Sequence, residues 1–115
     1  MITFEDFKKV EITVGKIISA EKVADTDKLL KLFVDFAEKN EIGESKPRQI
    51  ISGISMHFLD PSSLIGRKCM FVTNLEPRVI RGLESNGMLL AVSTDDGKFS
   101  LLEPDPEIPE GTRAK

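Results

Sequence analysis

The sequence predicts an all-β domain, in which five strands close into a barrel with a short N-terminal helix and a proline-rich C-terminal strap. Three observations predict this class. Short apolar runs recur along the chain and are separated by Gly, Asp, Asn and Ser, the residues typical of turns. Residues 60–66 have helix signals and lie between the third and fourth of these runs. The 115 residues suit one domain, and 40% of them are hydrophobic, which supplies a core without disulfides.

A short helix is predicted at the N-terminus. Thr3 and Asp6 have the spacing of a capping box, and Phe4 and Phe7 would share one face of the helix. A helix this short is not stable alone. We therefore expect its phenylalanine face to dock either on its own barrel or on a partner subunit.

Alternating apolar residues predict the strands. The first, Glu11–Val23, contains Gly15, where we expect the strand to be bent or bulged as a barrel requires. The other predicted strands are Leu29–Phe36, Arg48–Ile54, Arg67–Leu75 and Gly87–Thr94, followed after an Asp-Gly turn by a short strand at Phe99–Leu102. Gly53, near the end of the third strand, permits close approach either of a packing neighbour or of a ligand.

The connections complete the predicted fold. Asp60 is placed to cap a helical turn that starts at Pro61 and ends at Gly66. Prolines 104, 106 and 109 favour an extended strap along the surface. Five strands with a helix between the third and fourth are the layout of an OB-fold, a five-stranded Greek-key barrel. The pattern alone also fits an SH3-like barrel or a small sandwich.

No catalytic or metal-binding set is recognisable in the sequence. His57 is the only histidine, which disfavours a four-ligand zinc site, and its apolar neighbours suit a packing role. No glycine-rich phosphate motif occurs, and no cofactor is predicted. Cys69 is the only cysteine, so an intrachain disulfide is excluded and the reducing cytoplasm is favoured. No apolar run is long enough to cross a membrane, and the N-terminus does not read as a secretory signal.

The charge distribution points to an anionic partner although the net charge is −3. Residues 46–81 hold six basic and two acidic residues, whereas both flanking segments are net acidic. Such a basic island would attract phosphates. In a short chain, segregation of this kind also arises by chance.

The stretch Asn74–Leu90, read as NLEPRVIRGLESNGMLL, is the most distinctive part of the chain. Two apolar runs flank a polar, turn-rich connection of about a dozen residues, and loops of that length are usually functional. We interpret it as the long loop of a hairpin that holds RNA. Because Trp and Tyr are absent, contacts to phosphates and to RNA shape would outweigh base stacking.

The chain resembles the tRNA-binding domain family along nearly its whole length. The resemblance rests on DFKKVEITVGKI, KLLKLFVD, ISGI and IPEGT, and above all on NLxPRxxRGxxSxGMxLA within residues 74–91. This family includes the OB-fold module at the C-terminus of many methionyl-tRNA synthetases and free-standing tRNA-binding proteins. The resemblance implies that residues 1–115 are one non-catalytic domain that binds tRNA largely independently of its sequence. It also implies a homodimer and association with the synthetase catalytic domain.

The resemblance implies a set of RNA-binding residues as well. Arg78 and Arg81 would neutralise phosphates, Asn74 and Ser85 would contact sugar or base edges, and Met88 would give an apolar contact. Further RNA-binding residues implied by the resemblance are Lys31, Ser52, Gly53 and Pro77.

The chain departs from the family pattern at Glu76 and Val79, where relatives are often basic. Both changes remove positive charge, so we expect weak, salt-sensitive binding. Two other functions stay open: a protein-binding or export-chaperone-like role, known for a sister branch of the fold, and an enzyme of unrecognised type.

Overall fold

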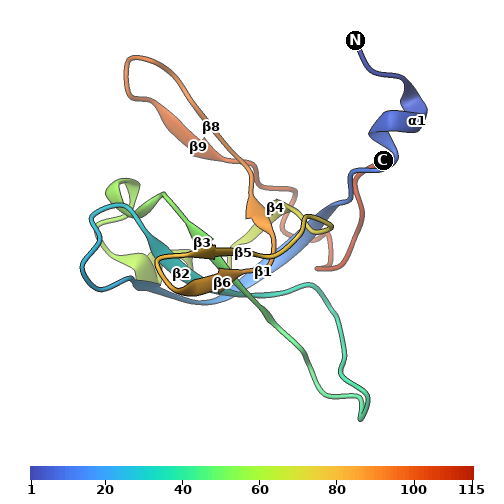
Figure 1. Ribbon diagram of the computed structural model, residues 1–115, viewed down its shortest axis with the longest axis horizontal. Coiled ribbons are helices and arrows are strands. Elements are labelled where there is room, and N and C mark those ends of the chain that lie inside the picture. Colours follow the sequence, from blue (N-terminus) through green and yellow to red (C-terminus); the bar gives the residue numbers. More distant parts are fainter.

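The computed structural model describes residues 1–115, which form a five-stranded antiparallel sheet with three projecting segments (Figure 1). The strands of the sheet, in the order β3-β2-β1-β4-β7, are β3 (Arg48–Ser52), β2 (Leu30–Asp35), β1 (Ile12–Lys22), β4 (Lys68–Val72) and β7 (Met88–Leu89). The two ends of this order meet, because Asn86 donates its backbone N–H to the carbonyl of Gln49 at 2.8 Å. The result is a nearly closed barrel, and the predicted all-β, OB-fold-like class is confirmed.

The core lies inside this barrel and follows the strand alternation of the sequence. On β2 every second residue is fully buried and the residues between them face outward. The buried residues of β2 are Leu30, Leu32 and Val34, and they pack with Ile17, Phe36, Ile50, Ile54, Leu64, Cys69, Phe71, Leu89 and Leu101. Burial of each large side chain contributes roughly 1.5 to 3 kcal/mol.

The long strand β1 is bulged, but at another residue than predicted. Its register with β2 shifts at Ile18, whereas Gly15 pairs regularly with β4. A Cβ atom on Gly15 would lie 2.5 Å from side-chain atoms of both Val34 and Phe36. The glycine therefore serves the packing of the core, and the predicted bulge at Gly15 is wrong.

Two 3-10 turns connect β3 to β4, η1 (Ser55–His57) and η2 (Pro61–Leu64). Asp60 caps η2, since its carboxylate accepts the backbone N–H of Ser62 at 3.0 Å, and Leu64 is fully buried at one end of the barrel. The predicted helical turn between the third and fourth strands is confirmed, as a 3-10 helix.

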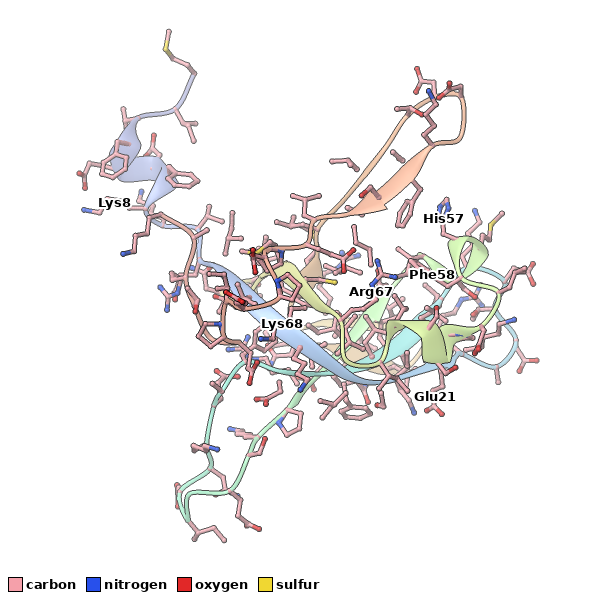
Figure 2. All side chains as sticks on the ribbon, turned by 180° about the vertical axis from the view of Figure 1, so that it is seen from behind. Lys8, Glu21, His57, Phe58, Arg67 and Lys68 are labelled. Atoms are coloured by element: carbon pink, nitrogen blue, oxygen red, sulfur yellow. The ribbon has the colours of Figure 1, made fainter.

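The predicted fifth strand, Gly87–Thr94, divides in two. β7 pairs with β4, whereas β8 (Ala91–Ser93) pairs with β9 (Phe99–Leu101) in a hairpin that projects from the barrel (Figure 1). The ring of His57 in η1 stacks on Phe99 with 3.8 Å between ring centroids. Figure 2 shows His57 and Phe58 beside this hairpin. His57 is exposed, and its stacking on Phe99 is the packing role that the sequence indicated.

Both ends of the chain lie on the outside of the barrel. Helix α1 (Phe4–Phe7) has the predicted capping box but no buried residue, and Phe4 and Phe7 are 69% and 38% exposed. In this structure the phenylalanine face is therefore not docked on its own barrel. The C-terminal segment is the predicted extended strap, bonded to β1 through Gly111 N–H to the carbonyl of Val14 at 2.8 Å. No helix is long and apolar enough to cross a membrane.

Candidate nucleic-acid interface

Between β4 and β7 the chain forms a second hairpin where the sequence predicted an open loop. Its strands β5 (Arg78–Ile80) and β6 (Leu83–Ser85) pair antiparallel. The two turn residues, Arg81 and Gly82, have φ angles of 52° and 78°. Positive φ at both central residues is what a type I′ turn requires. The motif found in the sequence is therefore an ordered β-ribbon that presents Arg81 at its tip.

This hairpin covers the free edge of β3 (Figure 1). The buried Ser85 hydroxyl accepts the backbone N–H of Ile51 at 3.0 Å, and the side-chain amide of Gln49 donates to the carbonyl of Glu84 at 2.9 Å. An uncovered edge strand exposes unpaired backbone groups. The first bond occupies the N–H of Ile51, and together the two bonds fix the hairpin on the barrel.

The hairpin presents two free cations. Arg78 and Arg81 are both exposed, and neither takes part in any of the eight salt bridges of the chain. Val79, between them, is 73% exposed and lies opposite Glu84 across the hairpin. An exposed guanidinium without a carboxylate partner is available to a phosphate group.

Half of the predicted basic island is neutralised within the fold. The carboxylates that pair with Arg48, Arg67 and Lys68 lie at 2.7, 2.6 and 3.7 Å and belong to Glu38, Glu103 and Glu110. Hydrogen bonds from Arg48 and Arg67 lower the pKa values of Glu38 and Glu103, respectively. In Figure 2, the view from behind, Arg67 and Lys68 lie near the strap. The free cations of the island are therefore Lys46, Arg78 and Arg81.

A groove lies between the hairpin tip and the loop that joins β1 to β2. It has a volume of about 420 Å³ and is lined by residues 25–29 of that loop and by Ile80 and Arg81. In OB-folds the loop between the first two strands and the loop between the last two flank the ligand. Here these loops meet, with Lys28 and Arg81 as unpaired cations and Asp25 and Asp27 offsetting part of their charge.

The predicted site residues fall into two groups. Lys31, Ser52 and Gly53 form the first group, because Ser52 pairs with Leu30 on β2, next to Lys31. Lys31 is bound to Glu21, with 2.6 Å between its Nζ atom and the carboxylate. No protein atom lies within 4 Å of a Cβ built on Gly53, so the packing neighbour is absent and the ligand alternative stays a prediction.

The other group lies on or beside the hairpin. Pro77 is exposed directly before β5, and Met88 is 45% exposed on β7. Asn74 lies farther off, where its side-chain amide donates to the carbonyl of Lys9 at 2.6 Å and accepts the N–H of Glu11 at 2.8 Å. The polar groups of Asn74 and Ser85 are thus engaged inside the fold, although both were predicted to contact RNA.

Two residues that the sequence reasoning missed belong to this surface. Lys28 lines the groove with Arg81, and the position of its loop in an OB-fold was the available signal. Phe33 lies half-buried on the outward side of β2, opposite Gln49. The alternation of β2, which buries its neighbours Leu32 and Val34, would have identified it as an outward-facing ring.

The comparison with known proteins identifies the family. Residues 12–113 match the family model described as a putative tRNA binding domain. The chain belongs to the tRNA-binding domain family. It is 46% identical over 112 residues to the methionine–tRNA ligase of Caldanaerobacter subterraneus subsp. tengcongensis, a match that covers 97% of this chain and 16% of that protein. The chain thus spans only about 16% of the length of the curated relatives it matches first.

Two solved structures share the fold over their whole length. The MetRS related protein from Pyrococcus horikoshii is 37% identical with a TM-score of 0.86, and the match covers 100% of this chain and 98% of that one. The chaperone CsaA from Bacillus anthracis str. Ames is 29% identical with a TM-score of 0.80, covering 100% and 99%. The chain is therefore similar in structure both to a synthetase-related protein and to a chaperone.

Proposed function

We propose that this chain is a non-catalytic module that binds tRNA largely independently of its sequence. The β5–β6 hairpin carries the proposal. It is bonded along β3, it holds Arg78 and Arg81 free of carboxylates, and it forms a groove with the loop between β1 and β2. Phosphate contacts give affinity without sequence information, which suits a general tRNA binder. The expected cytoplasmic location is the compartment where this function would operate.

A filter-binding titration of tRNA at two salt concentrations tests the proposal. We expect Arg78→Ala together with Arg81→Ala to weaken binding and to lower the salt slope by roughly 0.7 to 0.9 for each lost phosphate contact. The matched control is Lys98→Ala with Lys115→Ala, which removes two charges outside the groove. An RNA without stem-loops should bind more weakly than tRNA. If the double arginine variant binds tRNA at low salt as the wild type does, the proposed site is wrong.

We further propose that the module acts with a methionyl-tRNA synthetase catalytic domain, to which it would tether tRNA. Tethering raises the local concentration of a ligand without any new contact at the catalytic site. Fusion of this chain to a synthetase fragment that lacks such a module should lower its KM for tRNA and leave kcat unchanged. The same fusion with the double arginine variant should not lower KM.

The second candidate function is binding of unfolded proteins, which the likeness to the chaperone CsaA favours. The recesses near the hairpin are lined mainly by polar residues, and this disfavours an apolar peptide ligand. An unfolded peptide and tRNA should be compared in one binding assay. If the chain binds the peptide but not tRNA, the proposed tRNA-binding function is wrong and binding of unfolded proteins is supported.

We also propose that the chain forms a homodimer through α1. Its two phenylalanines have no cover on their own barrel, and a four-residue helix needs a docking surface. Sedimentation should show a dimer for the intact chain and a monomer for Phe4→Ser with Phe7→Ser. Ile42→Ser is the control, since Ile42 is 79% exposed on another loop. A monomeric intact chain would exclude the dimer.

A further inference from the structure

A second recess lies at the base of the hairpin, at the opposite end of β3 from the groove. Its volume is about 510 Å³, larger than the 420 Å³ of the groove at the tip. No large hydrophobic residue lines it. The lining residues that matter here are Lys39, Lys46, Arg48, Gln49, Glu84 and Asn86.

The cations of this recess are not equivalent. Arg48 is engaged inside the fold, because it donates to both carboxylate oxygens of Glu38 and to the carbonyl of Thr73 at 2.7 to 2.8 Å. Arg48 thus engages both oxygens of Glu38, and the nearby positive charge of Lys46 contributes to lowering the pKa of this carboxylate. Lys39 and Lys46 are exposed and form no salt bridge, although both line the same recess as Glu38. Two free ammonium groups therefore border the space.

The side chain of Asn86 is free for a ligand. Its backbone N–H is bonded to the carbonyl of Gln49, whereas its carboxamide forms no hydrogen bond within the protein. The residue is half-buried and lines the recess. A carboxamide offers two donors and one acceptor oxygen, which match the edge of a nucleobase or a ribose hydroxyl.

The hairpin joins the two recesses. Arg81 lies at its tip in the groove, Arg78 lies at its other end opposite Ser85, and Asn86 follows Ser85 at the base. Free cations thus continue from Lys28 at one end of β3 to Lys46 at the other. Both recesses therefore adjoin the hairpin that carries the two free arginines.

We infer that the recess at the base of the hairpin is a second RNA-binding subsite, in which Lys39 and Lys46 hold phosphates and Asn86 contacts a sugar or base edge. This inference rests on the proposed tRNA-binding function and extends it beyond the groove at the tip. RNA bound here straddles the hairpin. The bound segment is consequently longer than the groove alone would admit.

The two lysines and Asn86 should affect the salt dependence of RNA binding differently. Lys39→Ala with Lys46→Ala removes charge, so it should lower the salt slope by roughly 0.7 to 0.9 per lysine. Asn86→Ala removes neutral hydrogen bonds, so it should weaken binding about threefold to tenfold and leave the salt slope unchanged. Asn86→Asp keeps the shape and adds a negative charge, and it should weaken binding further.

The experiment is a titration of an unmodified tRNA transcript against these variants at two salt concentrations. Lys98→Ala with Lys115→Ala is the charge-matched control, and thermal unfolding verifies that each variant is folded. If the Lys39 and Lys46 variant equals the control while the Arg78 and Arg81 variant loses affinity, the second subsite is wrong and the proposed function stands. If the wild type itself does not bind the transcript, the proposed function fails and the subsite with it.

Discussion

The Ser85 hydroxyl lies 3.0 Å from the backbone nitrogen of Ile51 and accepts its hydrogen bond, although 34 residues separate the two in sequence. Ser85 is 4% exposed, and the same hydroxyl donates to the carbonyl of Gly87 at 3.2 Å. One side chain therefore binds the hairpin to β3 and shapes the turn that leads into β7. The position of the candidate interface depends on this contact.

Replacing Ser85 by alanine should loosen the hairpin. The N–H of Ile51 would be left without a partner, and an unsatisfied buried donor costs about 1 to 3 kcal/mol. Urea denaturation should show this loss, and hydrogen exchange at the Ile51 amide should become faster. Ser93→Ala on the exposed strand β8 is the control and should change neither quantity. Equal behaviour of the two variants would mean that the bond does not hold the hairpin.

Replacing the turn residue Arg81 should change the stability of the fold and the affinity for tRNA in opposite directions. Its φ of 52° is unfavourable for most side chains but is readily adopted by asparagine. Arg81→Asn creates the Asn-Gly pair that type I′ turns prefer, and it should raise the free energy of unfolding by about 0.5 to 1 kcal/mol. Because the charge is lost, tRNA affinity should fall while stability rises.

Arg81→Lys is the matched comparison for this variant. It keeps the charge and the unfavourable φ, so the salt slope of tRNA binding should stay close to that of the wild type. Unfolding and filter-binding measurements on the two variants show whether RNA recognises the charge of Arg81 or its guanidinium group. A loss of affinity in both variants would show that the guanidinium geometry, rather than the charge, is recognised.

Local features of this fold could be predicted from the sequence. The alternation of Leu30, Leu32 and Val34 predicted β2 because inward and outward side chains alternate along a strand. The capping pairs at Thr3 and at Asp60 act over three residues or fewer. Such signals depend only on neighbours in sequence, and they predicted the first four strands within three residues of their observed bounds.

Long-range contacts account for what could not be predicted. The role of Gly15 depends on Val34 and Phe36, and nothing near Gly15 in sequence indicates how closely those side chains approach. The β5–β6 hairpin was missed because Arg81-Gly82 lacks the usual Asn-Gly or Asp-Gly pair. The internal bonds of Asn74 reach the segment after α1, more than sixty residues away. The sequence identified the motif of the site but not which of its polar groups are free.

Replacement by alanine should lower the stability of the fold at Gly15 but not at Gly53. Gly15→Ala places a methyl group 2.5 Å from side-chain atoms in the core, and such overpacking costs roughly 1 to 3 kcal/mol. Gly53→Ala meets no atom within 4 Å, so stability should stay within about 0.5 kcal/mol of the wild type. If RNA approaches Gly53 closely, only this second variant loses tRNA affinity without losing stability. Thermal unfolding and filter binding measure the two effects, and unchanged affinity would remove Gly53 from the interface.

The thiol of Cys69 should make the fold sensitive to alkali. Burial, and to a lesser extent the nearby Glu103 carboxylate, raise its pKa to about 12 from an ordinary value of 9.0. Between these values the unfolded chain releases the proton and the folded chain keeps it. The free energy of unfolding should therefore be unaffected by this group below pH 9 and should fall as the pH rises, by about 1.4 kcal/mol at one unit above the unfolded pKa.

Comparison with Cys69→Ala isolates this contribution from the other groups that titrate in alkali. The variant should be less stable at neutral pH because it leaves a small cavity in the core. Its stability should nevertheless decline less steeply than that of the wild type between pH 8 and 10, since it has no thiol to ionise on unfolding. Urea denaturation at several pH values in this range gives both slopes. Parallel slopes would mean that the thiol is hydrated in the folded state, and the dry core around β4 would have to be reconsidered.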